Sequence, residues 1–227
     1  MKKYLIIAGV LISFLSSCIK SELMPENAVS GTKLFYAEVP SDDTRTYMDG
    51  DYEIHWTEDD RISVFCSPAN EQYRFTGGTG AQRGTFESLT DPVTPIYGRN
   101  YAIYPYQSVN TSSDEGTINI TIPSVQTYEE KSFGLGANTM AAVTDDIQDD
   151  TFRFRNVCGY LMLKLYGGDR IKRITLRGND GEKIAGAATI TAGYDADPAI
   201  AMSETATTEI TLDCPSEGIP TNKSEDF

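Results

Sequence analysis

Short runs rich in β-branched and aromatic residues, separated by turn residues, recur along most of the chain and constrain its fold more than any other feature. Runs of roughly four to eight such residues between turn signals are typical of β-strands. No segment after residue 18 carries the apolar stripe with a 3.6-residue period that marks an amphipathic helix. The pattern therefore predicts an all-β protein with a β-sandwich architecture.

The clearest alternation lies in YLMLKLY, residues 160–166, where Leu161, Leu163 and Leu165 would share one face of a strand. Asp49-Gly50 and Asn179-Asp180-Gly181 are typical of hairpin turns, whose central positions favour positive φ. The predicted strands are 33–39, 45–48, 52–56, 61–66, 72–76, 84–87, 101–104, 117–122, 139–143, 151–155, 160–166, 172–177, 183–191 and 209–213.

The chain is long enough for one large sandwich or two small ones. The segment TDDIQDDT, residues 144–151, holds four aspartates and only Ile147 to bury, so it is the best predicted boundary. We therefore expect an N-terminal sandwich at 33–150 and the start of a C-terminal one at 151–227. Residues 18–32 are largely polar and aperiodic, which predicts a flexible tether.

Residues 1–17 have the features of a lipoprotein signal peptide. Lys2 and Lys3 precede an apolar stretch of twelve residues, too short for a membrane-spanning helix, which needs about 20. The Leu-Ser-Ser-Cys sequence that follows resembles a bacterial lipobox, which predicts cleavage between Ser17 and Cys18 and acylation of Cys18. Several acyl chains on one residue would hold the protein at the outer membrane or cell surface. The alternative is an ordinary secreted protein with a cysteine near its cleavage site.

The chain is strongly acidic, with 19 basic and 33 acidic residues and a formal net charge of −14. This charge argues against nucleic-acid binding and against electrostatic attachment to anionic lipid, so the predicted membrane contact is the lipid anchor. Residues 153–183 are the exception, with eight basic residues and three acidic ones. Solvent-facing strands explain this stretch best, although it could also meet an acidic surface on a neighbouring copy.

Once Cys18 is acylated, three cysteines remain: Cys66, Cys158 and Cys214. An odd number allows at most one internal disulfide, and the spacings fit no zinc site. Cys66 closes an apolar run and Cys158 opens one. We therefore expect buried thiols.

The residue types that usually carry catalysis do not form a recognisable pattern. His55 is the only histidine, and the acidic segment 49–60 has Ile54 and Asp60 where a calcium loop needs glycine and glutamate. The glycine-rich segment 76–85 lacks the lysine of a phosphate loop. We predict no catalytic residue, no metal and no cofactor, and hence a protein that is not an enzyme.

Four tyrosines cluster around Pro105 in YGRNYAIYPYQ, and they are Tyr97, Tyr101, Tyr104 and Tyr106. Exposed tyrosines stack on sugar rings, so the cluster supports an alternative function as a glycan-binding surface lipoprotein. The pattern favours a strand that packs into a core or edge and stops at the proline.

Three segments resemble fimbrillin-like bacterial lipoproteins: WTEDDRISVF (56–65), YAIYPY (101–106) and the block FRFRNVCGYLMLKLYGGDRIKRITLRGNDGEKIAG (152–186). With the lipobox, the resemblance covers most of residues 18–213. Members of this family are subunits, anchors or accessory components of type V pili, or related surface adhesins. The resemblance implies tandem transthyretin-like β-sandwiches, export as a lipoprotein and no enzymatic activity.

In pilus-forming members an arginine-specific protease removes an N-terminal strand, and a strand from a neighbouring subunit fills the groove. On this chain the resemblance implies displacement of strand 33–39, with Arg45 as the candidate cleavage site. The implied partners are pilus or other surface subunits, copies of the chain itself, and a receptor that the sequence does not name. Because the chain ends in PSEGIPTNKSEDF without an alternating strand to donate, we expect an incomplete second sandwich that anchors or accepts a partner strand.

Overall fold

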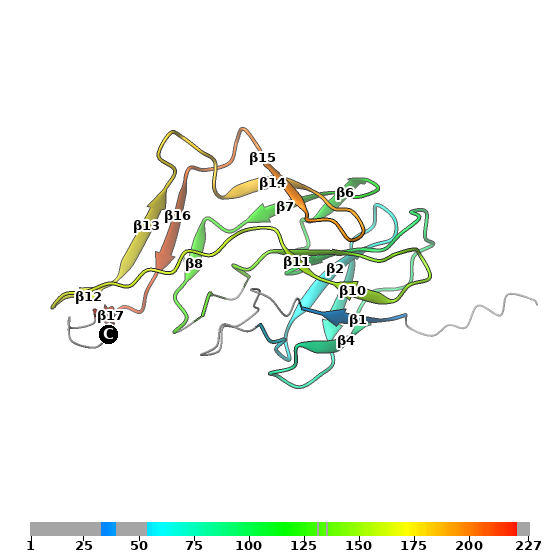
Figure 1. The fold of residues 1–227 in the computed structure, drawn as a ribbon, viewed down its shortest axis with the longest axis horizontal. Helices are drawn as coiled ribbons and strands as arrows, with labels where there is room; N and C mark the ends of the chain where they lie inside the picture. The colour runs from blue at the N-terminus through cyan, green and yellow to red at the C-terminus, as the bar shows by residue number, and fades with distance from the viewer. Residues whose placement is uncertain (1–32, 40–53, 131, 135, 222–227) are drawn as a thin grey trace, which may run out of the picture. The chain divides into compact units, whose positions relative to one another are not determined.

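The computed structural model describes residues 33–39, 54–130, 132–134 and 136–221, and every regular element in these ranges is a β-strand. This confirms the predicted all-β class. The strands form sheets of eight, four, three and two strands (Figure 1). Within the described ranges, no helix has the length and apolarity needed to cross a membrane.

The eight-stranded sheet nearly closes on itself. Its two marginal strands, β10 and β11, are separated in sequence only by Phe154, so the chain passes from one margin to the other within a few residues. The sheet has the order β10 (Thr151–Arg153), β1 (Leu34–Glu38), β4 (Arg83–Ser88), β3 (Glu71–Phe75), β2 (Arg61–Phe65), β5 (Tyr101–Tyr104), β9 (Met140–Val143) and β11 (Arg155–Asn156).

The remaining strands form three smaller sheets. The four-stranded sheet has the order β15 (Ala199–Met202), β14 (Gly186–Thr191), β7 (Thr117–Ile122) and β6 (Thr111–Asp114). The three-stranded sheet consists of β13 (Arg173–Arg177), β16 (Glu209–Asp213) and β8 (Val125–Thr127), and β12 (Arg170–Ile171) pairs with β17 (Ile219–Pro220).

Two apolar cores lie on opposite faces of the central strands. In β5, Ala102 and Tyr104 contribute to a core lined by all the longer strands of the eight-stranded sheet, with Trp56 fully buried in it. Tyr101 and Ile103 contribute to a second core, shared with the four-stranded sheet. Because strands alternate their side chains between faces, burial on both faces requires the nearly continuous apolar sequence of β5.

Most of the predicted strands are confirmed. Strands 101–104, 117–122 and 209–213 have the predicted bounds, and nearly all the others differ only at their ends. Strand 45–48 and the Asp49-Gly50 turn lie outside the described residues. In segment 52–56 the described part holds isolated bridges, with Trp56 facing Ala81. The sequence did not predict β6, β8, β12, β15 or β17, which are short or poor in β-branched residues.

The predicted strand at 160–166 is wrong, because the structure has no strand there and only Tyr166 takes part in a bridge. Leu161 and Leu163, expected on a buried face, are 62% and 49% exposed. Alternation shows that a segment has an apolar face, but a strand also needs a neighbouring backbone over several residues. At 179–181 Gly181 has a φ of +85°, yet the flanking strands β13 and β14 belong to different sheets, so the turn does not form a hairpin.

The sheets do not divide after residue 150, where we placed the domain boundary. β10 pairs with β1 and β11 with β9, so strands from both sides of that position complete the eight-stranded sheet. β14 likewise pairs with β7 in the four-stranded sheet. The acidic connection at 144–151 therefore links two strands of one sheet, β9 and β10.

Candidate partner-strand site

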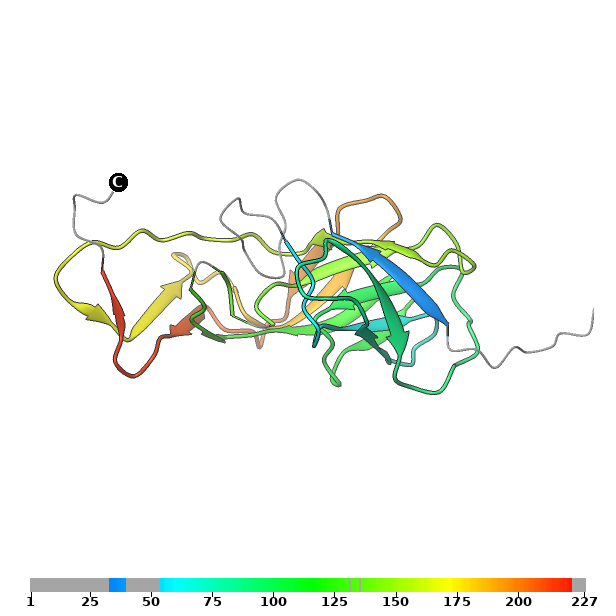
Figure 2. The ribbon, with the colours of Figure 1, turned by 90° about the horizontal axis from the view of Figure 1, so that it is seen from below.

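Strand β1, the first described strand, is hydrogen-bonded on both sides. It runs antiparallel to β4, with Phe35 opposite Phe86 and Ala37 opposite Gly84. On its other side it runs parallel to β10, with Ala37 opposite Phe152. Figure 2 shows β1 in blue beside the teal strand β4. The position of β1 is therefore a slot between two strands of the sheet.

The inward side chains of β1 fill this slot, and each position holds a side chain of a particular size. Phe35 is 1% exposed, and its ring centroid lies 4.6 Å from that of Phe152 and 5.2 Å from that of Tyr73. Ala37 is completely buried, and Val39 is buried at the end of the strand. Because close-packed interiors tolerate little change in volume, the slot accepts an aromatic, a small and an aliphatic residue at alternate positions.

Both ends of β1 are also held by polar contacts. Glu38 forms an ion pair with Arg83, and its carbonyl oxygen accepts a hydrogen bond of 3.0 Å from the backbone N–H of Phe154. At the other end, Lys33 Nζ donates to Asn100 Oδ1 at 3.3 Å and to the Ile147 carbonyl at 3.2 Å. Burial lowers the pKa of the Lys33 ammonium, and nearby groups such as Glu71 partly oppose this effect.

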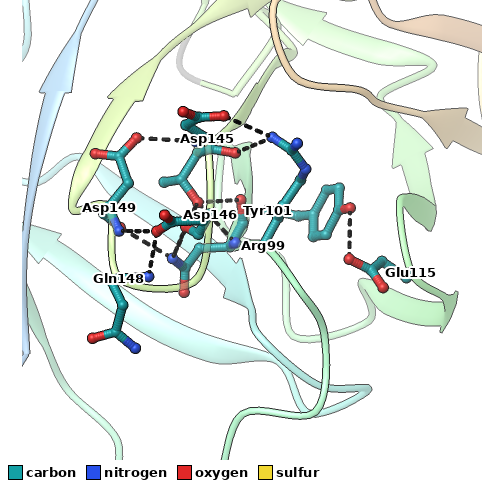
Figure 3. A network of polar contacts seen from close by, with 9 residues as sticks. Arg99, Tyr101, Glu115, Asp145, Asp146, Gln148 and Asp149 are labelled. Atoms are coloured by element: carbon teal, nitrogen blue, oxygen red, sulfur yellow. Dashed lines mark hydrogen bonds and ion pairs between the residues drawn. The ribbon is translucent and has the colours of Figure 1, made fainter.

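Figure 3 shows a polar network in the acidic loop, and Lys33 Nζ donates to the Ile147 carbonyl of the same loop. The Asn100 side-chain amide donates to the carbonyls of Ile147 and Asp149 at 3.2 and 3.1 Å. Asp146 Oδ1 accepts hydrogen bonds from the backbone N–H groups of Gln148 and Asp149, and Arg99 lies 3.5 Å from Asp145. The aspartates therefore cap backbone donors and form ion pairs, as turn-forming aspartates commonly do.

The two short segments of the family resemblance meet in the first core through Asp60 and Tyr104. Asp60 Oδ1 accepts a hydrogen bond of 2.8 Å from the Tyr104 hydroxyl, and Oδ2 accepts one of 2.7 Å from the backbone N–H of Thr57. The rings of Trp56 and Tyr104 pack edge to face with centroids 5.6 Å apart. Burial raises the pKa of the Asp60 carboxyl, while its hydrogen bonds to Thr57 and Tyr104 oppose the rise.

The tyrosine cluster is packed into the protein. Tyr101 and Tyr104 are buried, so their ring faces lie within the two cores. Tyr97 and Tyr106 are half-buried, and the Tyr97 hydroxyl lies 3.0 Å from Ser112 Oγ. This arrangement matches the interpretation of the YAIYPY segment as core packing and gives no open ring surface at Tyr101 or Tyr104.

Among the described residues, Cys66, Cys158 and Cys214 are free thiols. Cys66 is buried and its Sγ donates to Glu71 Oε1 at 3.2 Å, whereas Cys158 and Cys214 are half-buried. The described residues contain no group of three or more histidine, cysteine, aspartate or glutamate side chains arranged to bind a metal. Ser17, Cys18 and Arg45 lie outside the described residues.

Sequence reasoning placed β1 correctly but missed the contacts that hold it. Lys33, Asn100 and the loop 145–150 are far apart in sequence and show no shared pattern. Asp60 lies in segment 56–65 and Tyr104 in segment 101–106, yet nothing in the sequence indicates that the two residues are in contact. In comparisons with known proteins, no family model, curated protein or solved structure matches the chain.

Proposed function

We propose that this chain is a fimbrillin-like surface lipoprotein that acts in adhesion or in the assembly or anchoring of type V pili by accepting a partner's β-strand. In this proposal Cys18 carries the acyl chains that attach the protein to the outer membrane. The tandem transthyretin-like arrangement belongs to the same proposal, as does a binding function in place of an enzymatic one.

The observation that best supports strand acceptance is the position of β1. It is paired on both sides, and it supplies Phe35 and Ala37 to a core that otherwise comes from later parts of the chain. Arg45 lies in the sequence after Val39 and before Ile54, the described residues on either side of it. A cut after Arg45 would leave β1 bound only by non-covalent contacts, which an incoming strand of the same pattern could replace.

A partner strand would gain affinity from two rows of main-chain hydrogen bonds and specificity from the alternate side-chain positions. It would run parallel to β10 and antiparallel to β4, as β1 does. The small position opposite Gly84 is the most selective, because Ala37 is completely buried. An acidic residue in the place of Glu38 would retain the ion pair with Arg83.

The test is a strand-exchange experiment with limited trypsin treatment. Trypsin cleaves after lysine and arginine, and we expect the limited treatment to cut after Arg45 and to allow β1 to be released under mild denaturant. The cut protein should then bind a fluorescent peptide with the sequence of residues 33–39, measured by fluorescence anisotropy. A peptide with leucine in place of Ala37 is the matched control, because it keeps the length, charge and alternation.

Binding of the first peptide at least about tenfold more tightly than the control supports the proposal, which corresponds to about 1.4 kcal/mol. Equal binding of both peptides would contradict it, because the small position would not be selective. Failure of the cut protein to bind either peptide while it retains its β circular dichroism would also contradict it.

A further inference from the structure

The β1 slot continues, at the N-terminal end of the strand, into a cluster of polar groups around the ammonium of Lys33. Lys33 directly precedes β1, and its Nζ donates to Asn100 Oδ1 at 3.3 Å and to the Ile147 carbonyl at 3.2 Å. The same Nζ lies 4.5 Å from the ring centroid of Phe35, the first inward residue of the strand. An amide oxygen, a carbonyl oxygen and an aromatic ring therefore converge on one ammonium, whose three donors suit such an arrangement.

Asn100 is held in place by contacts that do not involve β1. It is 1% exposed, and its side-chain Nδ2 donates to Thr144 Oγ1 at 3.1 Å. The same nitrogen donates to the carbonyls of Ile147 and Asp149 at 3.2 and 3.1 Å. Because these acceptors fix the amide nitrogen, the amide oxygen is directed to Lys33. This oxygen is an acceptor only, so the position favours a residue that brings a hydrogen-bond donor.

Negative charge surrounds the same ammonium. Glu71 of β3 is 5% exposed, and its charge attracts the Lys33 ammonium, as do the charges of Asp149 and Asp150. Burial raises the pKa of the Glu71 carboxyl, while its hydrogen bonds and the charge of Lys33 oppose the rise. A buried carboxylate is costly without an opposing charge, so a strand that brings a cation to this point is favoured. Lys33 as a whole is exposed, so its side chain reaches the cluster from the surface.

We propose that Asn100 Oδ1, the Ile147 carbonyl and Glu71 form a lysine socket, which selects a lysine two residues before the inward aromatic residue of an incoming strand. This inference rests on the proposed acceptance of a partner strand and narrows the class of partner. The partner strand carries a lysine, an aromatic and a small residue at successive alternate positions, as Lys33, Phe35 and Ala37 do here. An apolar residue at the first position would leave the Asn100 oxygen without its donor and weaken binding.

The first test compares three peptides on the chain cut after Arg45. One has the sequence of residues 31–39, and the others carry Lys33→Met and Lys33→Glu. Each is acetylated and carries its fluorophore at the C-terminus, so that no terminal ammonium competes for the socket. Fluorescence anisotropy should show at least about fivefold weaker binding for Lys33→Met and weaker binding still for Lys33→Glu. Equal binding of all three peptides would overturn the socket and leave strand acceptance intact.

The second test changes the charge of the socket. Glu71→Gln keeps the size of the side chain and removes its charge, so the preference for lysine over methionine in the peptide should fall at least about twofold. Glu204→Gln is the matched control, because Glu204 is exposed and lies between β15 and β16. This control should keep the full preference. A preference that Glu71→Gln leaves unchanged would overturn the assignment of Glu71 to the socket.

The third test uses the intact chain, in which β1 itself occupies the slot, and it does not depend on strand exchange. Lys33→Met should lower the midpoint of urea unfolding by at least about 0.3 M. Lys172→Met, which removes an exposed lysine between β12 and β13, should leave it unchanged. The double variant Lys33→Met/Glu71→Gln should lose less than the sum of the two single variants.

The intact-chain result separates the two proposals. Additive losses, or a midpoint that Lys33→Met does not change, would overturn the socket. A cut chain that binds none of the peptides, together with non-additive losses in the intact chain, would contradict strand acceptance and support the recognition of Lys33 by the socket.

Discussion

The hydroxyl of Tyr104 donates a hydrogen bond of 2.8 Å to Oδ1 of Asp60, and each of these residues is 2% exposed. They come from positions 44 residues apart, one before β2 and one at the end of β5. A buried carboxylate is tolerated only when hydrogen bonds replace the lost water, and here Tyr104 and the backbone of Thr57 supply them. This pair therefore fixes the turn before β2 against the first core.

Removing Asp60 should destabilise the fold more than removing the hydroxyl of Tyr104. Tyr104→Phe deletes one hydrogen bond and should lower the free energy of unfolding by about 1–2 kcal/mol. Asp60→Ala leaves both the Tyr104 hydroxyl and the Thr57 N–H without their acceptor. This variant should lower the free energy of unfolding by about 2–4 kcal/mol. Urea unfolding followed by circular dichroism measures both values. Losses below about 0.5 kcal/mol for both variants would contradict the role assigned to the pair.

Stability should depend on pH through Asp60. Because burial raises the pKa of the Asp60 carboxyl in the folded state, the folded protein binds this proton more tightly than the unfolded chain. The stabilisation that comes from this tighter proton binding is fully present below the pKa of the carboxyl in the unfolded chain, about 4. It is lost as pH rises through the pKa of the carboxyl in the folded protein. The stability of the parent chain minus that of Asp60→Asn should therefore fall as pH rises from about 3 to about 7. A difference that rises over this range would show that the hydrogen bonds outweigh burial.

Gly84 should not tolerate a side chain. A Cβ at this position would lie 1.9 Å from Cε2 of Phe75, whose ring is buried and cannot move aside easily. We expect Gly84→Ala to lower the free energy of unfolding by about 1–3 kcal/mol through overpacking. Gly78→Ala is the control, because a Cβ there has no neighbour within 4 Å. Equal stability of the two variants in thermal unfolding would contradict the packing described.

Cys66 should resist alkylation in the native protein. Burial, followed by the hydrogen bond to Glu71, raises the pKa of the Cys66 thiol to about 12, so almost no reactive thiolate is present near neutral pH. Iodoacetamide at about pH 8 should modify half-buried Cys214 at least about one hundredfold faster than Cys66. Peptide mapping by mass spectrometry gives the two rates, and denaturant should remove the difference. Comparable native rates would show that Cys66 is accessible.

Attachment to the membrane should depend on Cys18. Acyl chains contribute about 0.8 kcal/mol per buried methylene group, so their loss should move most of the protein from the membrane fraction to the soluble fraction. Cell fractionation of Cys18→Ser measures this change, with Cys66→Ser as the control for loss of an unrelated thiol. Membrane retention of Cys18→Ser would contradict the proposed lipid anchor.

Local sequence patterns predicted the strands correctly where the apolar pattern of a strand matches the burial of its faces. Strand 117–122 alternates isoleucine with polar residues, and strand 101–104 is apolar throughout because both faces are buried. The prediction failed at 160–166, where Leu161 and Leu163 have the right alternation but lie on the surface. Whether such a segment joins a sheet depends on neighbours that are distant in sequence.

The partner-strand site could be predicted only in part for the same reason. Phe35 and Ala37 were expected on a strand, but their neighbours Phe152 and Gly84 follow from pairings between strands that are distant in sequence. The aspartates at 145–150 indicated a boundary because nothing in their sequence reveals that Asn100 and Lys33 bind the loop backbone. Polar contacts between distant segments carry no periodic signal.

The near closure of the eight-stranded sheet has a consequence for how this chain folds during synthesis. β1 and its neighbour β10 are separated by more than one hundred residues, and β10 and β11 emerge from the ribosome after every other strand of that sheet. A nascent chain shorter than this leaves β1 with one open flank, which a chaperone or another chain can reach. The first described strand to be synthesised thus keeps one open side until β10 has been made.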